Sequence, residues 1–390
     1  MEAAVAVVLS KPRKLKRAAK RLFESCPSLG SKKEAKALLN KLLEEGTLEK
    51  SEEGLVRVSS SFLETASTRK RGRSLDEGGG GERTRQKKMK KQKKQKKRKM
   101  DEKNVEGRSA IISESGGGID PSSIRHILAP MVGASELPFR LLCRKYGATI
   151  AYTPMISSAR FCLPSEQAYR DELFQTAELD RPLVAHFSAN NPEEMAKAAK
   201  IVEPECDAID LNLGCPQRVA YVGHYGSYLL GDKDRDLVLS IVKETSAAVS
   251  VPVFVKIRLL DTVEETCTLV GQLRDAGAKL VAIHARYRAS FERNSAGARD
   301  GPAMLDQVKY IKERFPNFPI ISNGNIKTFQ DCEKNLAFTK ADGVMSAEGI
   351  LDNPALFLDS LKGSNDDYAT LKEFSADKTN LATEYLQLVS

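Results

Sequence analysis

From residue 124 onward, short apolar and β-branched runs alternate with helix-forming stretches eight times over about 230 residues. The expected strands are Ile124–Ala129, Thr149–Thr153, Leu183–Phe187, Ala208–Asn212, Val253–Ile257, Leu280–His284, Ile320–Asn323 and Gly343–Ala347. Helices are expected at Ser135–Tyr146, Pro192–Val202, Leu237–Ser246, Val263–Ala276, Met304–Phe315 and Thr328–Leu336. Eight β/α units of this size predict an α/β fold, the (β/α)8 TIM barrel. A doubly wound open sheet is the alternative, but it usually carries a glycine-rich turn after its first strand, where this chain has Ala129-Pro130-Met131.

A charge asymmetry sets the N-terminal quarter apart from this barrel. Residues 1–100 carry 29 Lys and Arg against 12 Asp and Glu, out of totals of 61 and 52, so the remaining residues are net acidic. Residues 66–120 are of low complexity, and ten of the thirteen residues in Lys87–Lys99 are basic. Such a segment cannot bury enough apolar surface to fold, and it predicts a basic linker that contacts RNA, directs the chain to the nucleus or nucleolus, or both. The alternative is that this segment is a plain solvated linker. The expected location of the protein is the nucleus or nucleolus together with the cytoplasm.

Residues 1–65 predict a small helical module with the outline of a winged helix. A basic, helix-forming segment is followed by Ser31, which stands at capping-box spacing before a second helical stretch. Gly46–Lys50 and Gly54–Val58 then have the pattern of two short strands joined by a turn. The alternative is a pair of solvated helices, because a module of about 50 residues has a marginal core.

Cysteine usage and hydropathy exclude several classes of protein. The seven cysteines are scattered and odd in number, without Cys-x-x-Cys spacing, which favours reduced thiols over a disulfide framework or a structural metal. No window approaches 18 uninterrupted apolar residues, so no membrane span is expected. The N-terminus lacks the basic start of a signal peptide.

Polar residues collect at the carboxyl ends of the expected strands, where TIM barrels build their active sites. The clearest ends are His186-Phe187-Ser188, Asn212-Leu213-Gly214-Cys215-Pro216, Lys256-Ile257-Arg258, His284-Ala285-Arg286 and Ser322-Asn323-Gly324-Asn325. A single Cys is more often a small buried apolar residue than a catalyst, and a single strand-end Lys is usually solvated. Seven of eight strand ends with such residues together predict an active site.

The loops after the last two strands indicate which kind of ligand the site binds. Asn323-Gly324-Asn325 and Ala347-Glu348-Gly349 supply small residues and backbone N–H groups in the two loops that commonly bind phosphate in this fold. A phosphate there, with Lys256 and His284 on the same rim, favours a flavin mononucleotide (FMN) site over a sugar-phosphate site. Lys256 would stabilise charge on the reduced ring, and His284 would help to hold the cofactor's tail.

Several motifs on this rim resemble those of the tRNA-dihydrouridine synthase family. They are Leu128-Ala129-Pro130-Met131-Val132, Tyr152-Thr153-Pro154-Met155, Ile209-Asp210-Leu211-Asn212-Leu213-Gly214-Cys215-Pro216-Gln217, Gly223-His224-Tyr225-Gly226, Val255-Lys256-Ile257-Arg258, Asn323-Gly324-Asn325-Ile326 and Gly343-Val344-Met345-Ser346-Ala347-Glu348-Gly349. Residues 121–362 are identified as an FMN-binding barrel of this family, most like the eukaryotic subfamily that acts on uridines 16 and 17 of the tRNA D-loop.

The resemblance implies that NADPH or NADH reduces FMN, and that a monomer reduces specific uridines of tRNA to dihydrouridine. Cys215 takes the role of the acid that protonates C5 of the base, and an ordinary thiol is mostly protonated at neutral pH, as an acid must be. Asn212 and Arg286 are implied to bind substrate. The implied cofactor residues are Pro130, Met131, Val132, Lys256, His284, Asn323, Gly324, Asn325, Ala347 and Glu348.

This chain departs from the family's pattern in three places. His186 stands where the family usually has Gln against the flavin ring, and Ala285 stands where it usually has Gly. Residues 363–390 have the pattern of a shortened start of the helical domain that follows the family's barrel, with a helix expected at Leu381–Val389. Two alternatives therefore stay open, an FMN-dependent oxidoreductase of small molecules and a catalytically inactive RNA-binding protein.

Overall fold

The computed structural model describes residues 123–288 and 301–389, Ile119, and three short N-terminal strands. It divides into two units, Met1–Arg98 and Lys99–Ser390. In the first unit, β3 (Leu55–Val58) pairs antiparallel with β1 (Arg13–Lys14) and with β2 (Leu48–Lys50). The two strands expected at residues 46–58 are thereby confirmed. The helices expected before them, and the linker apart from Ile119, lie outside the described residues.

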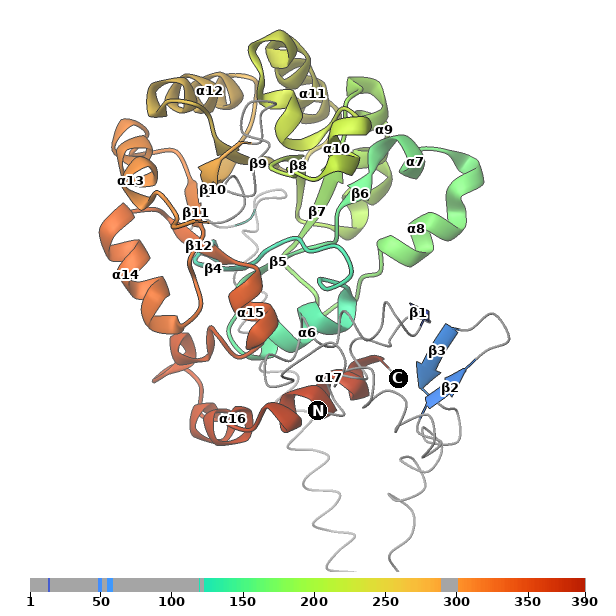
Figure 1. Cartoon of the computed structure of the whole chain (residues 1–390), viewed down its shortest axis with the longest axis vertical. Helices are drawn as coiled ribbons and strands as arrows, with labels where there is room; N and C mark the ends of the chain where they lie inside the picture. Colours follow the sequence, from blue (N-terminus) through green and yellow to red (C-terminus); the bar gives the residue numbers. More distant parts are fainter. Residues whose placement is uncertain are drawn as a thin grey trace, which may run out of the picture. The chain divides into compact units, whose positions relative to one another are not determined.

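In the second unit, eight parallel strands close into a barrel (Figure 1). They are β4 (His126–Leu128), β5 (Ile150–Tyr152), β7 (Leu183–Ser188), β8 (Ala208–Leu213), β9 (Val253–Leu259), β10 (Leu280–Tyr287), β11 (Ile320–Asn323) and β12 (Gly343–Ser346). The sheet runs from β5 through β4 and β12 back to β7, and the pairing of β7 with β5 closes it. This order confirms the TIM barrel and excludes the open doubly wound sheet.

Six helices surround the barrel where the sequence predicts them. They are α6 (Leu137–Lys145), α9 (Pro192–Val202), α11 (Arg235–Ala248), α12 (Val263–Asp275), α13 (Leu305–Arg314) and α14 (Phe329–Thr339). Side-chain caps fix where some of them begin: Thr262 and Glu265 form a capping box at α12, and Thr328 and Asp331 form one at α14. None of the helices among the described residues is long and apolar enough to span a membrane.

Short elements that the sequence did not predict fill several connections. Between β5 and β7 lie β6 (Ile156–Ser157), α7 (Ser158–Phe161) and α8 (Gln167–Leu173). The loop after β8 contains α10 (Arg218–Val222) and a 3-10 turn, η4 (Gly226–Leu230), and the loop after β12 contains α15 (Glu348–Asp352). The helical elements among these have at most seven residues, which is less than two turns of an α-helix and too short to show a helical period.

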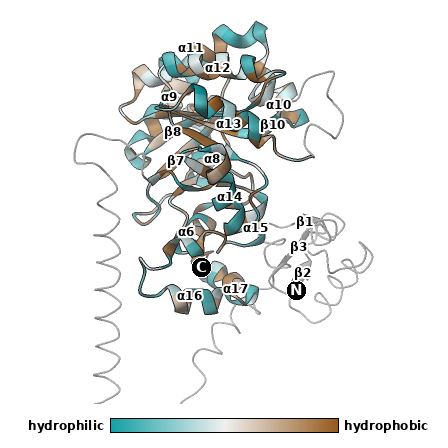
Figure 2. Cartoon of the chain, turned by 90° about the vertical axis from the view of Figure 1, so that its left-hand side faces the viewer, coloured by the Kyte–Doolittle hydropathy of each residue, from teal (hydrophilic) through white to brown (hydrophobic). Residues whose placement is uncertain are grey.

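The side chains that point into the barrel change from apolar to polar along the strands. At the amino ends an apolar cluster includes Val184, Ala208, Phe254, Leu280 and Ile321. Side chains two residues apart on a strand face the same side. His186, Asp210 and Lys256 therefore stand above this apolar floor, on β7, β8 and β9. Figure 2 shows the same division on a larger scale, with hydrophobic strands inside and hydrophilic outer faces on the helices.

After the barrel, α16 (Tyr368–Ser375) leads to α17 (Lys378–Val389), which packs against α6. The Tyr146 hydroxyl donates to the Glu384 carboxylate at 2.8 Å, the rings of Phe139 and Tyr385 are 6.3 Å apart, and Leu381 is buried. The expected helix at 381–389 is confirmed and begins three residues earlier. That it opens a separate helical domain stays a prediction.

Candidate active site

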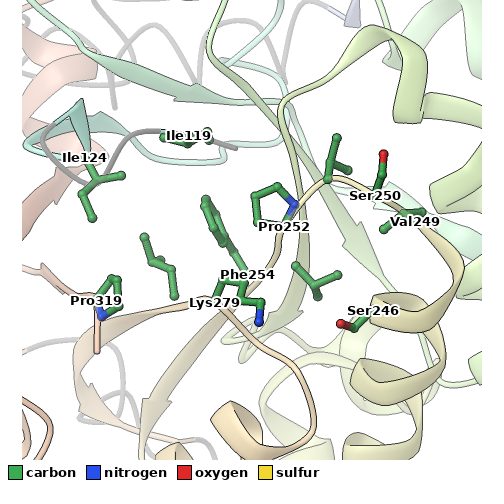
Figure 3. Close-up of a pocket in the computed structure, with 12 residues that line it drawn as sticks. Ile119, Ile124, Ser246, Val249, Ser250, Pro252, Phe254, Lys279 and Pro319 are labelled. Atoms are coloured by element: carbon green, nitrogen blue, oxygen red, sulfur yellow. The ribbon is translucent and has the colours of Figure 1, made fainter. Parts of the chain in front are cut away.

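The two ends of the barrel differ in chemistry. At the amino ends, a cavity of about 350 Å³ is lined mainly by apolar side chains, among them Ile124, Phe254 and Pro319 (Figure 3). It contains none of the residues that the sequence predicts for the site. Those residues lie at the opposite, carboxyl ends, where the polar inward-facing side chains are.

Asn212, the inward-facing residue near the end of β8, holds the start of the cysteine loop. Its Oδ1 accepts hydrogen bonds from the backbone N–H groups of Gly214 at 2.9 Å and Cys215 at 3.0 Å. Its Nδ2 donates to Met155 Sδ, a weak acceptor, at 2.9 Å. In Asn212, which is implied to bind substrate, the amide oxygen is thus occupied, whereas the amide nitrogen has only a weak partner.

Two further elements hold the carbonyls of this loop. Arg258 of β9 donates from Nε to the Gly214 carbonyl at 2.9 Å. Ser227 of η4 donates to the Cys215 carbonyl twice, from its backbone N–H at 3.1 Å and from Oγ at 3.0 Å. The peptide groups on both sides of Cys215 are therefore fixed by side chains from three elements.

Close packing of η4 against the loop requires a glycine. Gly226 has φ +69°, and a Cβ placed on it would lie 2.8 Å from the Cys215 carbonyl oxygen and 3.0 Å from the Cys215 Cβ. The Tyr228 hydroxyl, two residues on, donates to the Pro216 carbonyl at 3.1 Å. The last glycine of the Gly-His-Tyr-Gly motif thus lets one backbone segment lie directly on Cys215.

Lys256 brings a positive charge beside the cysteine loop. It pairs in register with Asn212 across β8 and β9. Burial, and to a lesser degree Arg258, lowers the pKa of Lys256 to about 8, while the charges of Asp210 and Cys215 act in the opposite direction. A cation held here at a desolvation cost is suited to binding an anionic group.

Below Lys256, a buried acid and imidazole form a pair inside the barrel. His186 Nδ1 lies 2.6 Å from Asp210 Oδ2, and both side chains are buried. Burial raises the pKa of Asp210, and His186 and Lys256 partly offset the effect. Among the described residues, Asp210 Oδ1 and the Tyr152 hydroxyl have no hydrogen-bond partner, so polar groups deep in the barrel remain available.

On the other side of the rim, Arg286 joins β10 to the loop after β11. It lies 2.8 Å from His284 Nε2, and it donates to Asn325 Oδ1 and to the Gly301 carbonyl, each at 2.9 Å. Gly324 has φ +139°, and a Cβ on it would lie 3.5 Å from the Arg286 guanidinium. Arg286, predicted to face the substrate, thus lies among the residues predicted for the cofactor's phosphate end.

His284 is held as a neutral ring. Burial, with the charges of Lys256, Arg258 and Arg286, keeps its pKa far below the usual range. A guanidinium only donates hydrogen bonds, so His284 Nε2 accepts from Arg286 and the ring hydrogen is assigned to Nδ1.

The remaining predicted residues also lie at the carboxyl ends. Pro130, Met131 and Val132 follow β4, and Val132 is 73% exposed. Ala347 and Glu348 follow β12 at the start of α15. Asn323 donates from its amide nitrogen to the Met345 carbonyl at 2.9 Å and so joins β11 to β12.

The sequence prediction left out residues that support the site. Ser227 and Tyr228 gave no signal, because their partners lie in the cysteine loop some twelve residues earlier. Asp210 and Tyr152 could have been placed inside the barrel, since they share strand faces with Ala208 and Ile150.

The comparisons with known proteins agree on one family. A family model described as dihydrouridine synthase (Dus) matches residues 127–389. The tRNA-dihydrouridine(16/17) synthase of Saccharomyces cerevisiae is 41% identical over 235 residues, which are 59% of this chain and 53% of that protein. The 16/17 synthase-like protein of Mus musculus is 39% identical over 60% of this chain and 47% of its own length. The 20a/20b synthase-like protein of Homo sapiens is 38% identical over 59% of this chain and 70% of its own length.

The names of these relatives include NAD(P)(+) or NAD(P)+, which denotes their nicotinamide coenzyme. The chain spans about half the length of the 16/17 relatives from yeast and mouse.

Proposed function

Because this chain belongs to the dihydrouridine synthase family, we propose that it is a flavin-dependent tRNA-dihydrouridine synthase acting on uridines 16 and 17 of the D-loop. The observation that carries the proposal is the loop of Cys215, fixed at the carboxyl end of β8 beside Lys256 of β9. The choice of uridines 16 and 17 rests on the identities to the yeast and mouse proteins.

The residues of the rim fit FMN. A ring that becomes anionic when it is reduced, with a phosphate tail, needs a cation near the ring and donors at the tail. Lys256 supplies the cation, and Arg286, with its neighbours Asn325 and His284, supplies polar groups at the other end. Asp210 Oδ1 and the Tyr152 hydroxyl, which have no partner among the described residues, are polar groups inside the barrel that would be available to the cofactor.

When bound, FMN would supply the hydride chemistry of the reaction, with NADPH or NADH as its reductant and C6 of the uracil as the acceptor. Cys215 completes the reduction by giving the proton of its thiol to C5, so that the C5–C6 double bond gains one hydride and one proton. The resulting thiolate regains its proton from solvent. Lys256 lies close enough to stabilise that thiolate electrostatically.

The chain's polar side chains would hold the base in place. A uridine in a folded RNA must leave its stack to reach the carboxyl ends of the strands. The Asn212 amide nitrogen, whose present acceptor is a thioether sulfur, can donate to a uracil carbonyl. We place Arg286 with the cofactor's phosphate because its three hydrogen bonds run to that side of the rim.

The proposal is tested with purified protein, NADPH and unmodified tRNA. We expect a yellow protein with a flavin absorbance band, and dihydrouridine at positions 16 and 17 by mass mapping. A colourless protein that cannot be loaded with FMN contradicts any flavin-dependent activity. A yellow protein that is reoxidised by small enones and leaves tRNA unchanged indicates an oxidoreductase of small molecules. A protein that binds tRNA without converting it indicates an inactive RNA-binding protein.

A further inference from the structure

The carbonyl of Cys215 accepts two hydrogen bonds from a single residue. Ser227 reaches it with its backbone N–H at 3.1 Å and with its hydroxyl at 3.0 Å. Ser227 is completely buried, so its hydroxyl has no solvent to bond instead. A buried hydroxyl directed at one carbonyl holds the orientation of that peptide group more firmly than the backbone bond alone.

This interaction belongs to a set of hydrogen bonds between side chains and the backbone of residues 214 to 216. Asn212 accepts hydrogen bonds from the backbone N–H groups of residues 214 and 215, and Arg258 donates to the Gly214 carbonyl. Tyr228 donates to the Pro216 carbonyl. Ser227 is the member of this set whose side chain acts on the carbonyl of the cysteine itself.

We infer that Ser227 is a positioning residue for Cys215, and that its hydroxyl keeps the sulfur aimed at the reacting carbon of the base. The inference rests on the proposed function, in which Cys215 delivers a proton. Proton transfer requires donor and acceptor within hydrogen-bond reach, and a misplacement of about 1 Å can cost a hundredfold in rate. Ser227 is buried and its hydroxyl bonds the Cys215 carbonyl, so it would act through the cysteine.

Ser227→Ala tests this role, with Ser246→Ala as the matched control. The control removes a hydroxyl from α11 at the amino end of the barrel, far from the cysteine loop. For Ser227→Ala we expect kcat for dihydrouridine formation to fall about tenfold or more, with KM for tRNA and the rate of flavin reduction by NADPH unchanged. Equal loss in the control, or unchanged kcat in Ser227→Ala, overturns the inference.

Thiol labelling supplies a readout that needs neither flavin nor tRNA. Iodoacetamide alkylation of Cys215, followed by peptide mass spectrometry, should be faster in Ser227→Ala than in the unmodified chain, because the loosened loop exposes the sulfur. The buried Cys143 should label equally slowly in both proteins. Equal labelling of Cys215 in the two proteins contradicts the inference, whether or not the chain makes dihydrouridine. A flavin-loaded chain that makes no dihydrouridine contradicts the proposed function instead.

If Ser227→Ala does not fold, Ser227→Cys carries the test. Its thiol has nearly the same shape as the hydroxyl but is only a weak donor, so the hydrogen bond to the Cys215 carbonyl is weakened. We expect a smaller fall in kcat, about threefold, with unchanged KM for tRNA and faster labelling of Cys215, which peptide mass spectrometry separates from the new thiol. Unchanged kcat and labelling overturn the inference.

Discussion

Asn212 divides its side chain between structure and chemistry. Its oxygen holds the N–H groups of Gly214 and Cys215, while its nitrogen points to Met155 and can turn to a substrate. A residue that the family resemblance implies to bind substrate therefore also shapes the loop that carries Cys215, the proposed acid. The two roles lie on different atoms, so different substitutions separate them.

Asn212→Asp should keep the loop and remove the hydrogen bond to the base. A carboxylate accepts from both backbone N–H groups as the amide oxygen does, but it cannot donate to a uracil carbonyl. We expect KM for tRNA to rise about tenfold and the labelling of Cys215 by iodoacetamide to stay unchanged. Asn212→Ala should instead speed the labelling, because it leaves two N–H groups without their acceptor. Equal labelling of both variants would contradict this division.

Lys256→Met should stabilise the flavin-free protein at neutral pH and abolish flavin retention. The pKa of Lys256 is about 8 when folded against its usual 10.5, so between these values the unfolded chain binds more protons and stability rises with pH. Below pH 8 the cost of the buried charge is fully present, and removing it should add roughly 1–3 kcal/mol. This gain should shrink as the pH rises from 8 to 10.5. Urea unfolding at pH 7 and pH 10 measures it, with the exposed Lys279→Met as control.

At the scale of the elements, the sequence predicts those with a local pattern of their own. All eight barrel strands were predicted from short apolar runs bounded by turn residues, and six helices from their period and their caps. The segment α10–η4 was not predicted, although its residues hold the loop of Cys215 in place. Its hydrogen bonds run from Ser227 and Tyr228 back to residues 215 and 216, a closeness that only folding creates. Cys215 and Lys256 could be placed on one rim because parallel strands end at the same side of a barrel.

Gly226→Ala and Gly133→Ala form a matched pair that tests the packing of η4 on the cysteine loop. Both glycines have positive φ, +69° and +74°, but a Cβ on Gly133 meets nothing within 4 Å. Gly133→Ala should cost about 1–2 kcal/mol for the backbone conformation alone. Gly226→Ala should cost about 1–3 kcal/mol more because its Cβ meets the Cys215 carbonyl. If both variants lose the same free energy of unfolding in urea, the close approach of residue 226 to the Cys215 carbonyl does not affect stability.

On the scale of the whole molecule, the chain joins a basic N-terminal quarter to a net acidic remainder. An acidic barrel is a poor surface for RNA, so we propose that the basic segment binds phosphates of the RNA and also directs the chain to the nucleus or nucleolus. Charge and low complexity were visible in the sequence. The partner of the basic segment was not, because a run of lysines fits any polyanion.

Deleting residues 1–105 should leave the flavin-loaded barrel intact and weaken its binding to tRNA. The slope of log affinity against log salt should become shallower by about 0.7–0.9 for each phosphate that the segment neutralises in the full chain. Fluorescence anisotropy with labelled tRNA at several salt concentrations measures the slope, and the absorbance spectrum of the same sample reports the flavin. An unchanged slope would mean that the segment serves only as an address.

The most direct measurement is the map of dihydrouridine in tRNA from a yeast strain that lacks its own 16/17 synthase and expresses this 390-residue chain. We predict dihydrouridine at positions 16 and 17 with the unmodified chain and none with Cys215→Ala, although the variant stays yellow when purified. Full conversion by Cys215→Ala would contradict the assignment of Cys215 as the proton donor. If uridines 16 and 17 stay unreduced although the original chain is present and flavin-loaded, the assignment as a tRNA-dihydrouridine synthase is contradicted.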